Sequence, residues 1–126
     1  MEQVLKSMTF DFFRKGLHKT TPDQLLGMKQ SVFLDVRTNE EAASMPFPLK
    51  MHTDVTSLHI PVSELPDRLA EIPRDIPIGV FCPQHIRASM CYAYLRSKGY
   101  DQVRVLEGGY AAMADVLKPG KIPTGI

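Results

Sequence analysis

The chain has 126 residues, of which 44% are hydrophobic and 23% are charged, and its formal net charge is +1. These values are typical of one globular domain filling residues 1–126, and they provide no broad basic surface for nucleic acid. Two cysteines are too few for the disulfide framework of a small secreted protein, and no run of about 18 apolar residues is present to span a membrane. Because the N-terminus also lacks the features of a signal peptide, we expect a cytoplasmic protein without a nucleic-acid or membrane partner.

The first segment of the chain predicts a short helix. Gly16 offers a stop, and apolar side chains recur before it at near-helical spacing, namely Val4, Met8 and Phe12. We therefore expect residues 1–17 to form a helical N-terminal extension of a core at 18–118. The apolar stripe is expected to pack on that core, and a dimer surface is the alternative.

Helical and strand patterns alternate in the rest of the chain. Thr21 is the expected N-cap of a short helix that begins with Pro22 and ends at Gly27, while Thr38 and Glu41 fit a capping box. Apolar and β-branched runs predict strands at 31–36, 58–60, 78–81 and 103–106. Further helices are expected at 39–44, 63–72, 86–98 and 110–117. The alternation predicts an α/β domain with a mostly parallel sheet covered by helices on both faces.

The helix at 86–98 has the clearest periodic pattern in the chain. Four residues of this helix lie along one stripe at helical spacing: Ile86, Met90, Ala93 and Tyr94. Gly99 follows at the position where helices commonly end in a left-handed residue.

The segment between the strand at 78–81 and the helix at 86–98 contains the candidate catalytic residue. Cys82 directly follows the strand, at the edge where active sites of open α/β sheets lie. The free N–H groups and the positive dipole end of a following helix favour an anion such as a thiolate, and they lower the pKa of a cysteine. Arg87 adds a positive charge with a planar fork that suits an oxyanion. A packing role is the alternative for Cys82, but packing does not require this combination of residues.

The same loop predicts how an anionic substrate is held. Pro83 has no N–H group, so the amides that bind the anion are those from Gln84 onward. The expected substrate-binding residues are Gln84, His85, Ile86 and Arg87. His85 also fits a proton donor or a substrate clamp, and a solvent-facing loop residue is the alternative.

Several segments, taken in order, resemble the rhodanese-homology domain over about residues 18–118: Phe33–Glu41, Ile60–Leu65, Cys82–Ser89, and Leu95–Tyr100 together with Val105–Tyr110. The resemblance implies a three-layer α/β/α fold with a five-stranded, mostly parallel sheet. It also implies that Cys82 forms a persulfide by taking the outer sulfur of a small anionic donor such as thiosulfate. The sulfur then passes to cyanide or to a thiol, and the sequence leaves open whether that thiol belongs to an acceptor protein. No cofactor is expected, and the histidines and cysteines lack the spacing of a metal site.

Within the superfamily that this resemblance indicates, the length of the loop after the cysteine distinguishes sulfurtransferases from phosphatases. Related phosphatases have one more residue between cysteine and arginine, whereas Arg87 follows Cys82 by five positions. This spacing favours sulfur transfer over a phosphatase or arsenate reductase. A non-catalytic protein-binding module stays open, because His85 stands where the family usually has glycine and a Gly-His-Ile element is missing. The interval at 45–57 is longer than usual, and we expect it to shape the pocket mouth or a partner surface.

Two further groups of residues are expected to be structural. Asp35 and Arg37 at a strand end are predicted to tie loops together, with Glu41 as the partner of Arg37. Cys91 lies about 7 Å along the helix axis from its start, so we expect it to pack in the core instead of forming a disulfide with Cys82.

Overall fold

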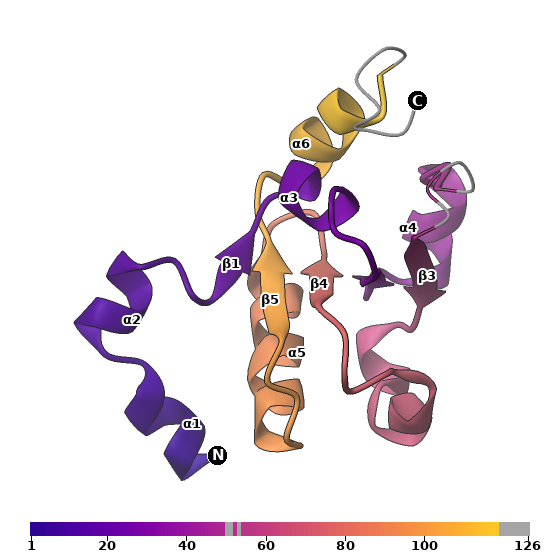
Figure 1. Cartoon of the computed structure of the whole chain (residues 1–126). Helices are drawn as coiled ribbons and strands as arrows, with labels where there is room; N and C mark the ends of the chain where they lie inside the picture. The colour runs from indigo at the N-terminus through magenta and orange to yellow at the C-terminus, as the bar shows by residue number, and fades with distance from the viewer. Residues whose placement is uncertain (50–51, 53, 119–126) are drawn as a thin grey trace.

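The computed structural model describes residues 1–49, 52 and 54–118, and its central feature is a five-stranded sheet in the order β1-β5-β4-β2-β3 (Figure 1). All neighbouring strands run parallel, which confirms the expected α/β fold. The strands are β1 Lys19–Thr20, β2 Ser31–Asp35, β3 Val55–His59, β4 Ile78–Phe81 and β5 Val103–Leu106. β3 begins before the strand expected at 58–60. The sequence does not predict β1, because its two polar residues lack any apolar run.

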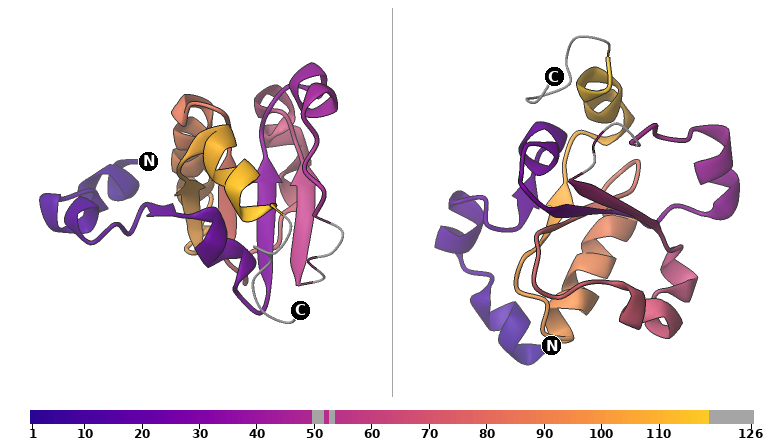
Figure 2. Two further views of the ribbon diagram at one scale, coloured as in Figure 1. Left: turned by 90° about the horizontal axis from the view of Figure 1, so that it is seen from above. Right: turned by 45° about the vertical axis from the view of Figure 1, so that its right-hand side comes forward.

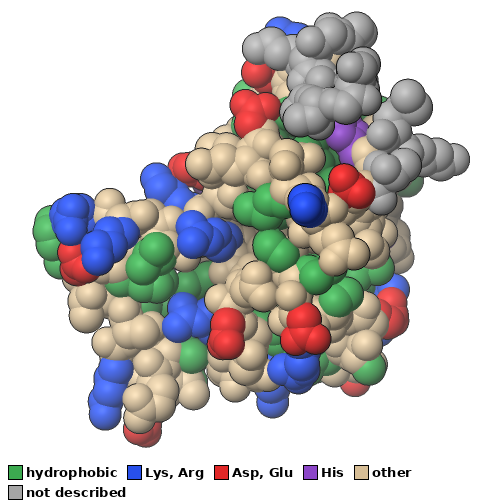
Figure 3. Space-filling model, in the orientation of Figure 1, with side chains coloured by type: hydrophobic (Ala, Val, Ile, Leu, Met, Phe, Trp, Pro, Cys, Tyr) green, Lys and Arg blue, Asp and Glu red, His purple; other side chains and the backbone are tan. Residues whose placement is uncertain are grey.

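Helices cover both faces of the sheet and give the expected three layers (Figure 2). On one face, α5 (Ile86–Ser97) packs in the same core cluster as the 3-10 helices η1 (Val62–Glu64) and η2 (Pro66–Glu71). On the other face, α3 (Pro22–Leu26) packs beside α6 (Gly109–Val116). In the described part of the chain, no helix is long and apolar enough to cross a membrane. Acidic and basic side chains are interspersed on the face that Figure 3 shows.

The N-terminal segment forms two short helices, α1 (Glu2–Ser7) and α2 (Phe10–Arg14), in place of the one predicted. Thr9 begins the second, because its hydroxyl accepts a hydrogen bond from an amide in the first turn of α2 at 3.2 Å. The apolar stripe packs inward as expected. Val4 is buried, and two partly buried residues lie against the core, namely Met8 and Phe12.

The continuous helix predicted at 63–72 is wrong, since this segment forms η1 and η2 instead. Pro66 has no amide hydrogen, so the α-type hydrogen bond to the carbonyl of Val62 cannot form. Arg68 inside η2 also departs from helical geometry, with φ −117° and ψ 16°. The segment therefore keeps the tighter 3-10 pattern, which is common in short connections.

α5 forms where it is predicted, and the stripe that indicates it in the sequence is partly exposed. Ile86 and Met90 are 67% and 63% exposed. The buried side chains of the helix are Ala88, Cys91, Tyr92 and Leu95. α5 carries two apolar stripes, and only its placement on the sheet decides which of them is buried.

α4 (Asn39–Ser44) begins at the predicted capping box, which the structure confirms. The Thr38 hydroxyl accepts a hydrogen bond from the Glu41 amide at 3.2 Å, and the Glu41 carboxylate accepts one from the Thr38 amide at 2.9 Å. The cap fixes the direction in which the chain leaves β2.

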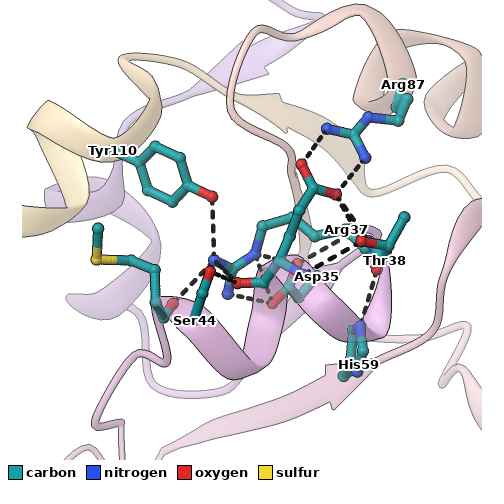
Figure 4. Close-up of polar contacts among 9 residues, drawn as sticks. Asp35, Arg37, Thr38, Ser44, His59, Arg87 and Tyr110 are labelled. Carbon is teal, nitrogen blue, oxygen red and sulfur yellow. Dashed lines mark hydrogen bonds and ion pairs between the residues drawn. The ribbon is translucent and has the colours of Figure 1, made fainter.

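A buried ion pair lies at the carboxyl end of β2. The Asp35 carboxylate accepts hydrogen bonds from Arg37 Nε at 2.9 Å and from Arg37 Nη2 at 2.7 Å. Arg37 Nη1 donates to the Met45 carbonyl at 2.8 Å and to the Tyr110 hydroxyl at 3.3 Å (Figure 4). Burial is the largest single influence on the pKa of Arg37 and lowers it, but the hydrogen bonds and charge interactions with Asp35 and Tyr110 together outweigh burial and raise the pKa. Asp35 and Arg37 therefore tie loops together, as expected.

The interval at 45–57 packs toward the body of the molecule at its described residues. The Phe47 ring lies 4.5 Å from the Arg37 guanidinium carbon and makes edge contacts with Phe33 and Phe81. Leu49 is also buried. Residues 50, 51 and 53 of this interval lie outside the described residues, so its predicted role at the pocket mouth or a partner surface stays a prediction.

Replacing Arg37 tests the importance of the buried pair. We expect Arg37→Met to lower the free energy of unfolding by about 3–5 kcal/mol, because the Asp35 carboxylate is left buried without a charge partner. Urea denaturation measures this difference. The matched control is Arg14→Met, which removes an exposed pair with Asp11 and should cost about 1 kcal/mol or less. Equal losses in the two variants would contradict a structural role for the buried pair.

Candidate active site

Cys82 lies directly after β4, at the central strand of the sheet. It belongs to the core cluster that holds Ile78 and Val80, so its side chain lies on the α5 face of the sheet. The residue is 1% exposed, and its Sγ accepts a hydrogen bond from the Ala88 amide at 3.2 Å. The sulfur is thus held at the first turn of α5, where unsatisfied amides and the helix dipole favour negative charge.

The loop from Cys82 to α5 is closed by contacts with the turn before α6. His85 is the N-cap of α5 and has φ 70°, and its Nε2 accepts a hydrogen bond from the Gly108 amide at 3.1 Å. A Cβ on Gly109 would lie 2.6 Å from the carbonyl oxygen of Pro83, so only glycine permits this approach. The loop after β4 and the turn after β5 are therefore packed against each other.

A pocket of about 460 Å³ opens beside the cysteine. Its walls are formed by Glu41, Cys82, Pro83, Gln84, Ile86, Arg87 and Tyr110. Three of the four predicted substrate-binding residues line the pocket. The exception among the described residues is His85, whose ring reaches the backbone of Gly108 instead.

Arg87 is held by Glu41, and both residues line the pocket. Figure 4 labels Arg87 and shows its guanidinium paired with a carboxylate. Its Nη1 and Nη2 donate to the two carboxylate oxygens of Glu41 at 2.6 Å and 2.9 Å. The prediction that Glu41 is the partner of Arg37 is wrong for the side chain, because Arg37 contacts only the Glu41 carbonyl, at 3.4 Å. The Glu41 carboxylate is instead held at the N-terminus of α4 by the hydrogen bond from the Thr38 amide, and there it pairs with Arg87.

The ion pair changes the electrostatics predicted for the pocket. Hydrogen bonds from Arg87 and Thr38 lower the pKa of Glu41 to about 2 from its ordinary value of 4.5. The same pair raises the pKa of Arg87. Both groups are charged near neutral pH, so Arg87 enters the pocket as half of a neutralised pair and not as an isolated positive charge.

Cys91 differs from Cys82 in its position, because it lies within α5 and not in the loop that precedes this helix. Both cysteines are free thiols, which agrees with the expected packing role of Cys91. Burial raises the pKa of the Cys91 thiol to about 11, so it stays protonated near neutral pH. It is absent from the walls of the pocket that Cys82 lines, as far as the described residues show.

Sequence reasoning did not place Tyr110 or Glu41 in the pocket. Tyr110 follows the Gly108–Gly109 turn, and its hydroxyl accepts the hydrogen bond from Arg37. The paired glycines are the only local signal of a close approach, and they do not identify the surface that is approached. The capping box places Glu41 on a helix but gives no indication of Arg87, which is 46 residues away.

Comparisons with known proteins agree on one family. The sequence pattern of the rhodanese-like domain matches residues 21–115. A sulfurtransferase of Allochromatium vinosum is 30% identical over 102 residues, which cover 81% of this chain and 89% of that protein.

Solved structures extend this agreement to the fold. A rhodanese-like domain protein of Staphylococcus aureus aligns with a TM-score of 0.62 at 28% identity, covering 76% of this chain and 90% of that one. An NAD-dependent persulfide reductase of A. fulgidus aligns with a TM-score of 0.58 at 34% identity, covering 80% of this chain but 17% of that one.

The pKa of Glu41 predicts how the stability of the pocket wall depends on pH. The folded-state pKa is about 2 and the ordinary value is 4.5, so the pair contributes fully above pH 4.5 and its contribution is lost as pH falls toward 2. We expect Glu41→Gln, which keeps an oxygen for the Thr38 amide, to be less stable than wild type by about 1 kcal/mol at neutral pH. Urea unfolding across this pH range should show the difference shrinking. A difference that does not change with pH would rule out the ion pair as its source.

Proposed function

Because this chain belongs to the rhodanese-like domain family of sulfurtransferases, we propose that it transfers sulfane sulfur through a persulfide on Cys82. The observation that supports this most strongly is the hydrogen bond from the Ala88 amide to Cys82 Sγ at 3.2 Å. It keeps the sulfur at a helix N-terminus, where backbone amides can bind an anion, beside a pocket of about 460 Å³.

The proposed cycle begins with a small anionic donor such as thiosulfate. The Cys82 thiolate attacks the outer sulfur of the donor, a new S–S bond forms on Cys82, and the donor S–S bond breaks. Sulfite leaves with the electron pair of that bond. The enzyme then carries one extra sulfur atom as a persulfide.

The second half of the cycle returns the enzyme to its starting state. Cyanide, or the thiolate of an acceptor, attacks the outer sulfur of the persulfide. The Cys82 thiolate leaves, and thiocyanate or an acceptor persulfide is released. No electrons are gained or lost by the enzyme over the cycle, so no redox cofactor is needed. An acceptor thiol carried by a small molecule and one carried by a protein both satisfy this chemistry.

The pocket is suited to a small anion mainly through its backbone. Pro83 contributes no N–H group, and the amides of Gln84, His85 and Ile86 precede or open α5, where a helix has no internal acceptors for them. We propose that these amides bind the donor and the persulfide. Arg87 has its charge balanced by Glu41, so its role is to shape the wall and to add directed hydrogen bonds.

The name of one relative agrees with this chemistry. The A. fulgidus protein is called a persulfide reductase, and the part of it that this chain matches has the same fold. The alternative of a phosphatase or arsenate reductase is opposed by the short spacing between Cys82 and Arg87. A non-catalytic module is opposed by the pocket beside Cys82.

Mass spectrometry of the intact protein tests the proposal. We expect incubation with thiosulfate to add one sulfur atom to the wild type and none to Cys82→Ala, since Cys82, unlike Cys91, is among the described residues that line this pocket. Adding cyanide should then release thiocyanate from the wild type alone. Cys91→Ala is the matched control and should gain and release sulfur like the wild type.

Two outcomes would overturn the proposal. A wild type that gains no sulfur lacks the activity, and a Cys82→Ala variant that gains as much as the wild type uses another nucleophile. Turnover of a generic phosphate ester that is lost in Cys82→Ala would instead establish a phosphatase.

A further inference from the structure

We propose that His85 is a positioning residue that holds the Cys82 loop against the turn before α6 and thereby fixes the Tyr110 wall of the substrate pocket. The inference rests on the proposed sulfur transfer for its kinetic test, and its structural test is independent of activity. Three observations carry it: the backbone conformation of His85, the hydrogen bond that its ring accepts, and the place of Tyr110 in the pocket.

The backbone at His85 favours a residue without a side chain. His85 has φ 70° and ψ −15°, and it is the only described non-glycine residue with a positive φ. This left-handed conformation costs free energy for a residue that has a Cβ, and glycine avoids the cost. The imidazole makes a contact that glycine cannot make, which offsets part of this cost.

That contact is the hydrogen bond from the Gly108 amide to His85 Nε2 at 3.1 Å. A ring nitrogen that accepts a hydrogen bond carries no proton, so the neutral ring has its proton on Nδ1. His85 is the N-cap of α5, and Gly108 is the N-cap of α6. The His85 side chain thus connects the N-cap residues of two helices that lie on opposite faces of the sheet.

The joined segments also touch through their backbones. The ideal Cβ position of Gly109 lies 2.6 Å from the Pro83 carbonyl oxygen, so the turn rests directly on the Cys82 loop. Tyr110 follows immediately and lines the pocket, and its hydroxyl accepts a hydrogen bond from Arg37 at 3.3 Å. A shift of the turn away from the loop therefore moves the Tyr110 wall.

The His85 side chain acts through this wall and not on the substrate itself, whereas the backbone amide of His85 belongs to the proposed anion site. Its side chain is not among the described residues that line the pocket, whereas its neighbours Gln84 and Ile86 are. The Ala88 amide holds Cys82 Sγ independently of the imidazole. Loss of the ring should therefore weaken substrate binding much more than it slows attack by the sulfur.

Two substitutions separate the ring contact from the backbone conformation. His85→Gly adopts the left-handed conformation freely but has no acceptor for the Gly108 amide. His85→Gln keeps a side-chain oxygen at about the reach of Nε2. We expect His85→Gly to raise the KM for thiosulfate about fivefold, the effect of one lost hydrogen bond, while kcat stays within about twofold. His85→Gln should recover most of the wild-type KM. His18→Gln, which replaces an imidazole outside the Cys82 loop and the Gly108 turn, is the control and should match the wild type.

Hydrogen exchange supplies the readout that does not need activity. The Gly108 amide should exchange faster in His85→Gly than in the wild type, and His85→Gln should restore its protection. An unchanged KM in His85→Gly, or a Gly108 amide that stays equally protected, would overturn the positioning role. If the wild type takes up no sulfur, the proposed function is wrong, and the exchange of Gly108 still decides whether His85 holds the turn.

Discussion

The buried pair of Asp35 and Arg37 is the interaction on which the arrangement of this site depends. A charge inside a protein must be paired and its hydrogen bonds satisfied, so a buried guanidinium dictates where its acceptors lie. Arg37 takes its acceptors from β2, from Met45 and from Tyr110. Of these groups Tyr110 lines the pocket itself, and the other two lie on either side of α4, which contributes Glu41 to the pocket. The chain after β2 is therefore held in place, and α4 begins where it can present Glu41 to Arg87.

The sheet order explains why these segments meet. β4 lies at the centre of the sheet with β2 on one side and β5 on the other, and all three strands are parallel. Their carboxyl ends open at the same edge, so the chain segments that follow them converge there. The segment after β2 supplies Glu41, the loop after β4 supplies the cysteine, and the turn after β5 supplies Tyr110. Each contribution is local in sequence, and the site forms only when the strands align.

The two cysteines show how position sets reactivity. Both are buried and free, yet Cys82 lies at the first turn of α5 beside a pocket, while Cys91 lies within the helix against the core. Burial raises the pKa of Cys91 to about 11, which keeps it protonated. The Ala88 amide donates a hydrogen bond to the Cys82 sulfur, and Cys82 lines a pocket in which a substrate can meet it. The residue type alone therefore does not identify the reactive thiol.

The sequence by itself determined the features that depend on interactions between residues close together in the chain. The strand, the cysteine, the short loop and the helix of the candidate site lie within one segment, and the Thr38–Glu41 cap spans four residues, so neighbouring residues encode them. Tertiary structure decided what joins distant segments: the pairing of Arg87 with Glu41, the bond between His85 and Gly108, and the face of α5 that is buried. These depend on how helices are placed on the sheet, and that placement follows from the packing of the whole core, which no local pattern of residues specifies.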